Sequence, residues 1–66
     1  MRIHFDEQAD ALYVRLDDSA IAESEEVRPG FVLDFNDKNE IVGFEILGLK
    51  GRVPQANLKQ IQFEVA

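Results

Sequence analysis

The sequence predicts a small α+β domain that is nearly all β: an antiparallel β-meander of four to five strands with one short helical element near the C-terminus. Runs in which apolar and polar residues alternate recur through most of the chain, and this is the period of half-buried strands. Turn-forming residues separate the runs. With 66 residues and no cysteine, the chain is predicted to form one domain, residues 1–66, with a small core that disulfides do not supplement.

The first two runs predict a pair of antiparallel strands, residues 2–5 and 11–16. Their apolar residues share one face: Ile3, Phe5, Leu12, Val14 and Leu16. Between the runs, the Asp6 carboxylate can accept hydrogen bonds from the amides two and three residues further on. The short connection is therefore predicted to be a tight turn capped by Asp6.

A weaker run, residues 21–27, is predicted to be an exposed edge strand. It carries Glu23 and Glu25 on one face, and charged side chains protect an edge strand from pairing with other chains. Pro29 and Gly30 follow and predict a turn, because Pro fixes φ and Gly accepts a positive φ.

The clearest signal is a hairpin in residues 31–47, with Asn39 in a left-handed turn position. Its best core candidates are Phe31, Leu33, Phe35, Val42, Phe44 and Ile46. The opposite face mixes apolar and acidic side chains, and we expect the C-terminal segment or a second subunit to cover it. Gly43 weakens its strand unless a bulge or a closely approaching group requires a glycine there.

Two alternatives remain open for the C-terminal segment. In the first, Pro54 begins a short helical turn that runs through Asn57 or Leu58, and Ile61 to Val65 form a closing strand. In the second, residues 54–63 form one helix with Leu58 and Ile61 on its apolar face.

Composition limits the possible partners. Thirteen acidic and seven basic residues give a net charge of −6, and the basic residues are scattered, which disfavours nucleic-acid binding and favours a basic protein partner. We expect a homodimer, because a core this small needs a supplement. No apolar run resembles a signal peptide or a membrane span, so we expect a cytoplasmic protein without membrane association.

Four groups of residues could carry chemistry. Asp6, Glu7 and Asp10 cluster in the first turn, but caps and solvated charges explain these residue types. The oxygen-bearing residues from Asp34 to Glu40 do not have calcium-loop spacing, because Lys38 and Asn39 stand where further ligands should begin. His4 is the only histidine and has no identifiable orienting carboxylate or nucleophile. Tyr13 and Arg15 share one side of their strand and could form a binding patch.

These features predict no catalytic, cofactor-binding or metal-binding residue, no cofactor and no enzymatic activity. The residues that we expect at an interface are Tyr13, Arg15, Val32, Ile41 and Leu47. The last three belong to the central hairpin and are apolar residues that fall outside its core set.

Several ordered sequence blocks between Arg2 and Leu47 resemble one family. They are His4-Phe5-Asp6, Ala9 to Val14 with Leu16, Glu23-Ser24, Glu26-Val27, Pro29-Gly30, Val32 to Phe35 and Ile41 to Leu47. This pattern is similar to the YuzE-like family of short bacterial proteins, domain of unknown function DUF2283. The family has no established activity, so the resemblance implies no catalytic residues.

Genes of the family are often found beside putative toxin genes, and the resemblance therefore implies an antitoxin-like interaction protein that binds a basic toxin. The DNA-binding segment and disordered tail of many antitoxins are not visible in the sequence. The alternative is a homo-oligomeric module that binds a small molecule or a metal between subunits, through His4, Tyr13 and the carboxylates of the first turn.

Overall fold

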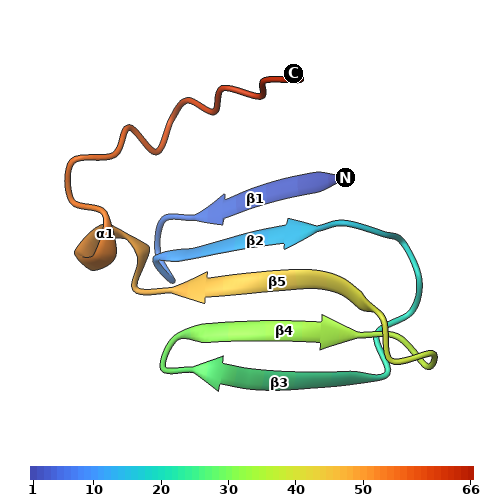
Figure 1. The fold of residues 1–66 in the computed structure, drawn as a ribbon. Coiled ribbons are helices and arrows are strands. Elements are labelled where there is room, and N and C mark those ends of the chain that lie inside the picture. Colours follow the sequence, from blue (N-terminus) through green and yellow to red (C-terminus); the bar gives the residue numbers. More distant parts are fainter.

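The computed structural model describes residues 1–66 as one antiparallel five-stranded sheet, a short helix and an extended C-terminal segment (Figure 1). The elements are β1 (Arg2–Asp6), β2 (Ala11–Arg15), β3 (Glu23–Arg28), β4 (Phe31–Phe35), β5 (Ile41–Leu47) and α1 (Leu49–Arg52). The predicted fold class, mostly β with one short helix near the C-terminus, is confirmed.

The strand order is β1-β2-β5-β4-β3, which is not that of a simple meander. The connection between β2 and β3 passes the end of β5 and carries the chain to the far edge of the sheet (Figure 1). This order places apolar β5 at the centre and glutamate-rich β3 at an edge, where its carboxylates stay in water. The edge position predicted for β3 is confirmed.

The turns form as their residues predict. The Asp6 carboxylate accepts hydrogen bonds from the backbone N–H groups of Gln8 and Ala9, at 3.0 and 3.1 Å. Gly30 has a φ of 80° and Asn39 a φ of 62°, so both occupy the left-handed region. These conformations allow β3 to reverse into β4 and β4 into β5.

The helix lies before Pro54, so both alternatives for the C-terminal segment are wrong. The Asp10 carboxylate accepts a hydrogen bond from Lys50 N at 3.0 Å, and Leu49 is buried, which fixes α1 directly after β5. Pro54 instead lies in a turn in which Ala56 N donates to Val53 O. No strand forms at residues 61–65 because neither edge of the sheet pairs with them. A helix of four residues is too short to cross a membrane.

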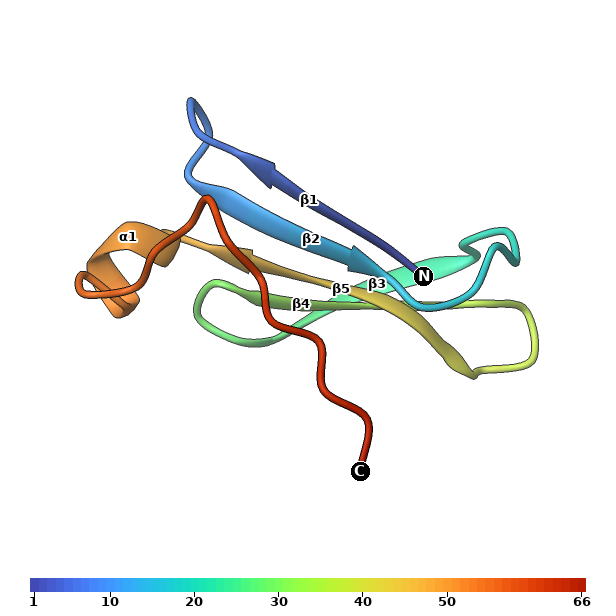
Figure 2. The same cartoon turned by 90° about the horizontal axis from the view of Figure 1, so that it is seen from above.

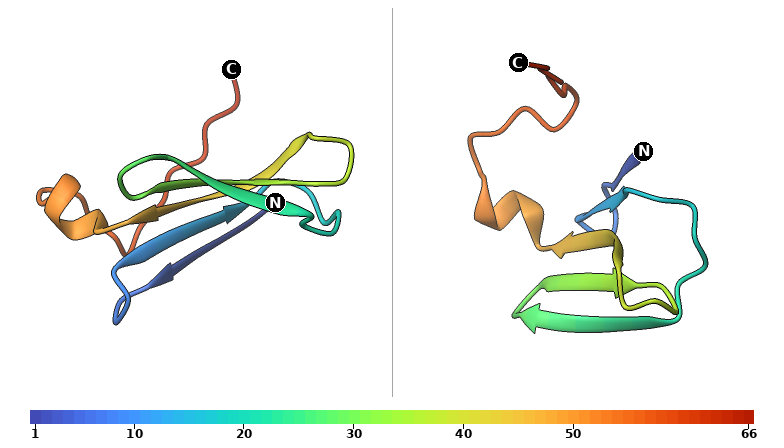
Figure 3. Two further views of the ribbon diagram at one scale, coloured as in Figure 1. Left: turned by 90° about the horizontal axis from the view of Figure 1, so that it is seen from below. Right: turned by 45° about the vertical axis from the view of Figure 1, so that its right-hand side comes forward.

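The molecule is one sheet layer, and the C-terminal segment runs away from it (Figures 2 and 3). Only seven of the 66 residues are buried, and Val42 is the only large side chain with less than 2% exposure. Of the six predicted core residues, Val42 alone is buried, and Phe31 is 36% exposed. The single layer explains this result, because no second layer covers the face on which the others lie.

Candidate functional site

Two rows of side chains cross the sheet and form one apolar face. Residues paired across strands point to the same face. One row contains Ile3, Val14, Phe44 and Leu33, and the other contains Phe5, Leu12, Ile46 and Phe31. These eight residues are the apolar face. Only Val14 among them is buried, and Ile3 is 42% exposed, so the face is a candidate docking surface.

One end of the apolar face is partly covered by α1 and the C-terminal segment. Leu49 and Leu58 line a hollow of about 370 Å³ together with Phe5 and Leu12. The Arg52 guanidinium lies over the Phe31 ring, 4.5 Å from its centroid. This geometry is a cation–π contact. The C-terminal segment therefore contacts one end of the apolar face, and not the mixed face, for which this segment or a second subunit was the expected cover.

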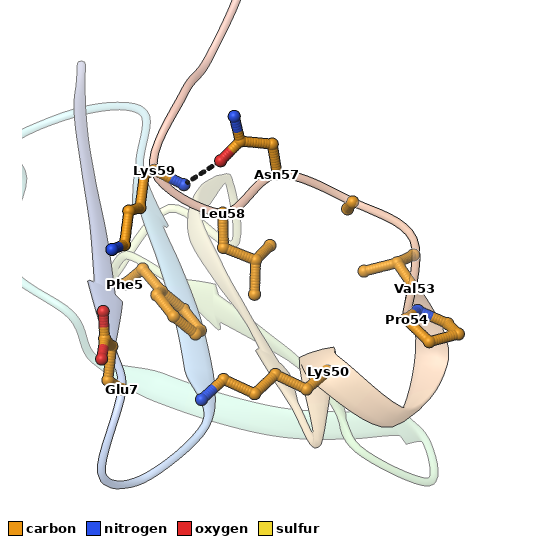
Figure 4. Close-up of a pocket in the computed structure, with 9 residues that line it drawn as sticks. Phe5, Glu7, Lys50, Val53, Pro54, Asn57, Leu58 and Lys59 are labelled. Atoms are coloured by element: carbon orange, nitrogen blue, oxygen red, sulfur yellow. Dashed lines mark hydrogen bonds between the residues drawn. The ribbon is translucent and has the colours of Figure 1, made fainter.

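A second hollow of about 430 Å³ lies between β1 and the C-terminal segment (Figure 4). Phe5 and Leu58 form its apolar wall, and Lys50 and Lys59 stand at its rim. Leu58 is the only residue between 53 and 66 that is even half-buried. The segment thus contacts the sheet through few side chains.

The opposite face carries a hydrogen-bonded polar network around Asp34, which is only 7% exposed. Its two carboxylate oxygens accept hydrogen bonds from Ser24 Oγ at 2.6 Å and from Tyr13 OH at 3.2 Å. Arg15 Nη1 donates to Tyr13 OH at 3.3 Å. The network passes over Gly43, where an added Cβ would lie 3.4 Å from Tyr13 OH. The close approach expected at Gly43 is therefore present.

Arg15 also fixes the connection between β2 and β3. Its guanidinium donates to Asp17 O at 2.6 Å and to Ser19 O. The hydrogen bond with Tyr13 raises the pKa of Arg15 above its ordinary value. Hydrogen bonds from the Ser19 hydroxyl and backbone N–H lower the pKa of Asp17 below 3.8. Tyr13 and Arg15 thus lie together as predicted, and both are engaged within the chain.

The other three predicted interface residues are spread along the central hairpin. Leu47 is 37% exposed at one end of β5, and Ile41 is 49% exposed at the other end, beside a bulge. Val32 lies between them in a row with Tyr13 and Glu45, on the face of the polar network. They do not form a continuous apolar patch with Tyr13 and Arg15.

The first-turn carboxylates and His4 do not converge. Asp6 caps its own turn, whereas Asp10 accepts the hydrogen bond from α1. No three His, Asp or Glu side chains come together as a metal site requires. His4 pairs with Tyr13 across β1 and β2, and both line an open hollow of about 550 Å³ with Arg2 and Arg15.

The β3 edge is acidic and exposed. Glu23, Glu25 and Glu26 are exposed, and none has an ion-pair partner in the chain, whose one ion pair joins Arg2 and Asp18 at 3.4 Å. The outer side of β3 has no neighbouring strand. This edge thus combines negative charge with unpaired main-chain groups.

Sequence reasoning missed Asp34 and Arg52. Asp34 was placed on the mixed face of its strand, but its role as the common acceptor for Ser24 and Tyr13 was not predicted. Arg52 donates to Leu47 O at 2.9 Å and to Pro29 O at 2.6 Å. No local sequence signal links Arg52 with a turn 23 residues earlier.

Comparison with known proteins gives one match. No curated protein and no solved structure matches the chain significantly. One family model, described as "Protein of unknown function (DUF2283)", matches residues 2–50, which include every strand and the buried residue of α1. The chain therefore belongs to the DUF2283 family, to which no function is assigned.

Proposed function

We propose that this protein is a cytoplasmic, non-enzymatic protein-interaction domain, an antitoxin-like component that binds a basic protein through the β3 edge. The observation that carries the proposal is the edge itself. Its three exposed glutamates have no cationic partner within the chain, and its outer main-chain groups have no neighbouring strand. An extended segment rich in Lys and Arg supplies both cations for the glutamates and main-chain partners for the open edge.

Main-chain pairing supplies affinity in this arrangement. An extended segment can add to an open sheet edge as a further strand, with its N–H and C=O groups paired along β3. Glu23 and Glu26 would then lie beside cationic side chains of the added strand. The net charge of −6 favours the encounter, because a negative surface accelerates association with a basic partner.

The test is binding to the product of an adjacent gene, measured by calorimetry and by surface plasmon resonance at low and physiological salt. Removing two carboxylates in Glu23→Gln/Glu26→Gln is expected to lower the association rate about tenfold at low salt and less at higher salt. The control variant Glu7→Gln/Glu64→Gln removes the same charge away from β3 and is expected to bind within about twofold of the unmodified chain.

Two results contradict the proposal. One is the absence of binding together with failure to relieve the toxicity of that gene product in cells. The other is equal weakening by the edge and control variants, because net charge rather than the β3 edge would then explain the interaction.

The open hollow beside His4 and Tyr13 favours one second candidate. Arg2 and Arg15 line it, which suits a small anionic molecule at a site that a second subunit completes. A thermal-shift screen of divalent metals and anionic metabolites tests this function, since a ligand that binds only the folded chain raises its melting temperature. No shift across the panel argues against it.

A further inference from the structure

We propose that a second copy of this chain covers the apolar face, so that two sheets pack face to face in a homodimer. The proposal concerns the eight residues of the apolar face and Glu25, which pairs with Leu33 at the end of one row. It is independent of the basic partner, because β3 lies at the edge of the sheet and stays open in such a dimer.

The exposed surface is too large for a folded chain of this mass. The accessible surface is 5248 Å², whereas a folded monomer of 7.5 kDa is expected to expose about 4,200 Å². The difference of roughly 1,000 Å² is close to the share of about 800 Å² that each partner buries in a standard interface. Part of this excess belongs to residues 53–66, of which all but Leu58 are exposed, and a face-to-face contact that also covers Ile61 accounts for an area of the observed size.

The shape of the molecule agrees with this surface excess. The radius of gyration is 12.8 Å, against about 10.8 Å for a compact domain of this length. Packing a second sheet about 10 Å away supplies the missing layer. It would also cover Ile61, which lines the same hollow as Ile3 and Phe5 and is 62% exposed.

A second copy suits the apolar face better than a basic protein does. None of the eight residues is charged, so the face offers the cations of a basic protein no carboxylate, whereas an identical face matches it in size and polarity. The row of Ile3, Val14, Phe44 and Leu33 ends at Glu25 on β3. Charged side chains thus lie only at the rim of the apolar face.

That rim charge favours one arrangement of the dimer. A two-fold axis parallel to the strands places β3 of one copy over β1 of the other. Glu25 of each copy then lies toward Lys59 of the other, since Lys59 lines a hollow with Ile3 and Phe5 beside β1. The alternative axis, across the strands, sets the two β3 edges against each other. Each edge carries Glu23 and Glu25 but only one cation, Arg28, so this arrangement brings two net negative edges together.

The test compares two adjacent residues of β4 that are both half-buried and point to opposite faces. Leu33→Lys puts a charge on the apolar face, and Val32→Lys puts the same charge on the polar face, between Glu26 and Glu45. Light scattering and sedimentation should give the unmodified chain a mass of twice 7.5 kDa. Leu33→Lys is expected to raise the dimer dissociation constant by on the order of 100-fold, and Val32→Lys by less than about threefold.

Isotope-filtered NMR on a mixture of labelled and unlabelled unmodified protein keeps the test decisive if Leu33→Lys does not fold. Intermolecular contacts to the Leu33 and Ile46 methyl groups are expected. A chain that is monomeric at all concentrations overturns the proposal, and so does a dimer without these contacts or one that only Val32→Lys disrupts. If the chain is monomeric and still binds the basic partner, only the dimer proposal fails. If the chain is dimeric and does not bind the basic partner, only the proposed function fails.

Discussion

Substitution of Gly43 by alanine tests whether the polar network requires a bare backbone beneath it. Gly43 is buried in the middle of β5, and a Cβ at this position would lie 3.0 Å from Val14 O, 3.4 Å from Tyr13 OH and 3.5 Å from Arg15 Cδ. The nearest atom belongs to the backbone of the paired strand and cannot rotate away. We expect the substitution to destabilise the fold.

Opposing free-energy contributions set the size of the stability change caused by Gly43→Ala. Alanine lowers the entropy of the unfolded chain, which alone would stabilise the protein by about 0.4–1 kcal/mol. Overpacking against Val14 O costs about 1–3 kcal/mol. Displacing Tyr13 OH also weakens its hydrogen bond to Asp34. The expected net loss is about 1–2 kcal/mol, or roughly 5–15 °C in melting temperature.

Urea unfolding at one fixed protein concentration measures this loss. Gly51→Ala is the matched control, because a Cβ there meets nothing within 4 Å and the residue lies in α1. It is expected to stabilise the chain by up to about 1 kcal/mol. Because Gly43→Ala already weakens the hydrogen bond of Tyr13 to Asp34, Tyr13→Phe should cost less stability in the Gly43→Ala variant than in the unmodified chain. Equal effects of the two substitutions, or a neutral or stabilising effect of Gly43→Ala, would refute the steric argument.

Three further predictions concern side chains that brace the backbone. Arg52→Ala removes two hydrogen bonds to backbone carbonyls and a stacking contact, and should cost about 1–2 kcal/mol by urea unfolding without rescue by Arg52→Lys. Asp10→Ala removes the acceptor for Lys50 N and should cost about 1–2 kcal/mol in the same assay. The lowered pKa of Asp17 stabilises the folded state above pH 3.8, and this contribution is lost as the pH falls through the folded-state pKa. An NMR titration of Ser19→Ala should show the Asp17 pKa returning toward 3.8, and an unchanged pKa would show that the Ser19 hydroxyl is not its main cause.

The strands and turns could be predicted from the sequence because local chemistry determines them. Alternation defined the strands, and Asp6, Gly30 and Asn39 marked the turns that the structure confirms. The position of β5 between β2 and β4 depends on which strands best fill the centre of the sheet, and no local signal encodes that choice. The helix was misplaced because Asp10 and Leu49 fix it through contacts that are distant in sequence.

The candidate site was predicted only in part for the same reason. Tyr13 and Arg15 were identified together, but Asp34, the acceptor that engages Tyr13, lies two strands away, and no local signal links the two residues. The sequence correctly indicated which residues share the apolar face. It could not indicate that this face lacks a covering layer, because coverage depends on where residues 53–66 run in space.

The polar braces give a reason to regard the open apolar face as functional. Arg52 joins α1 to the turn before β4, Asp10 joins the first turn to α1, and Arg15 joins β2 to the next connection. Each brace binds backbone atoms, and of the three only Arg52 also contacts the apolar face, at the Phe31 ring, so most of that face stays uncovered. A chain that needed only to fold alone could bury the same apolar residues by folding its C-terminal segment across them. Leu58 begins such a cover, but Phe63 and Val65 remain 74% and 83% exposed, and the central part of the face stays open, as the proposed dimer requires.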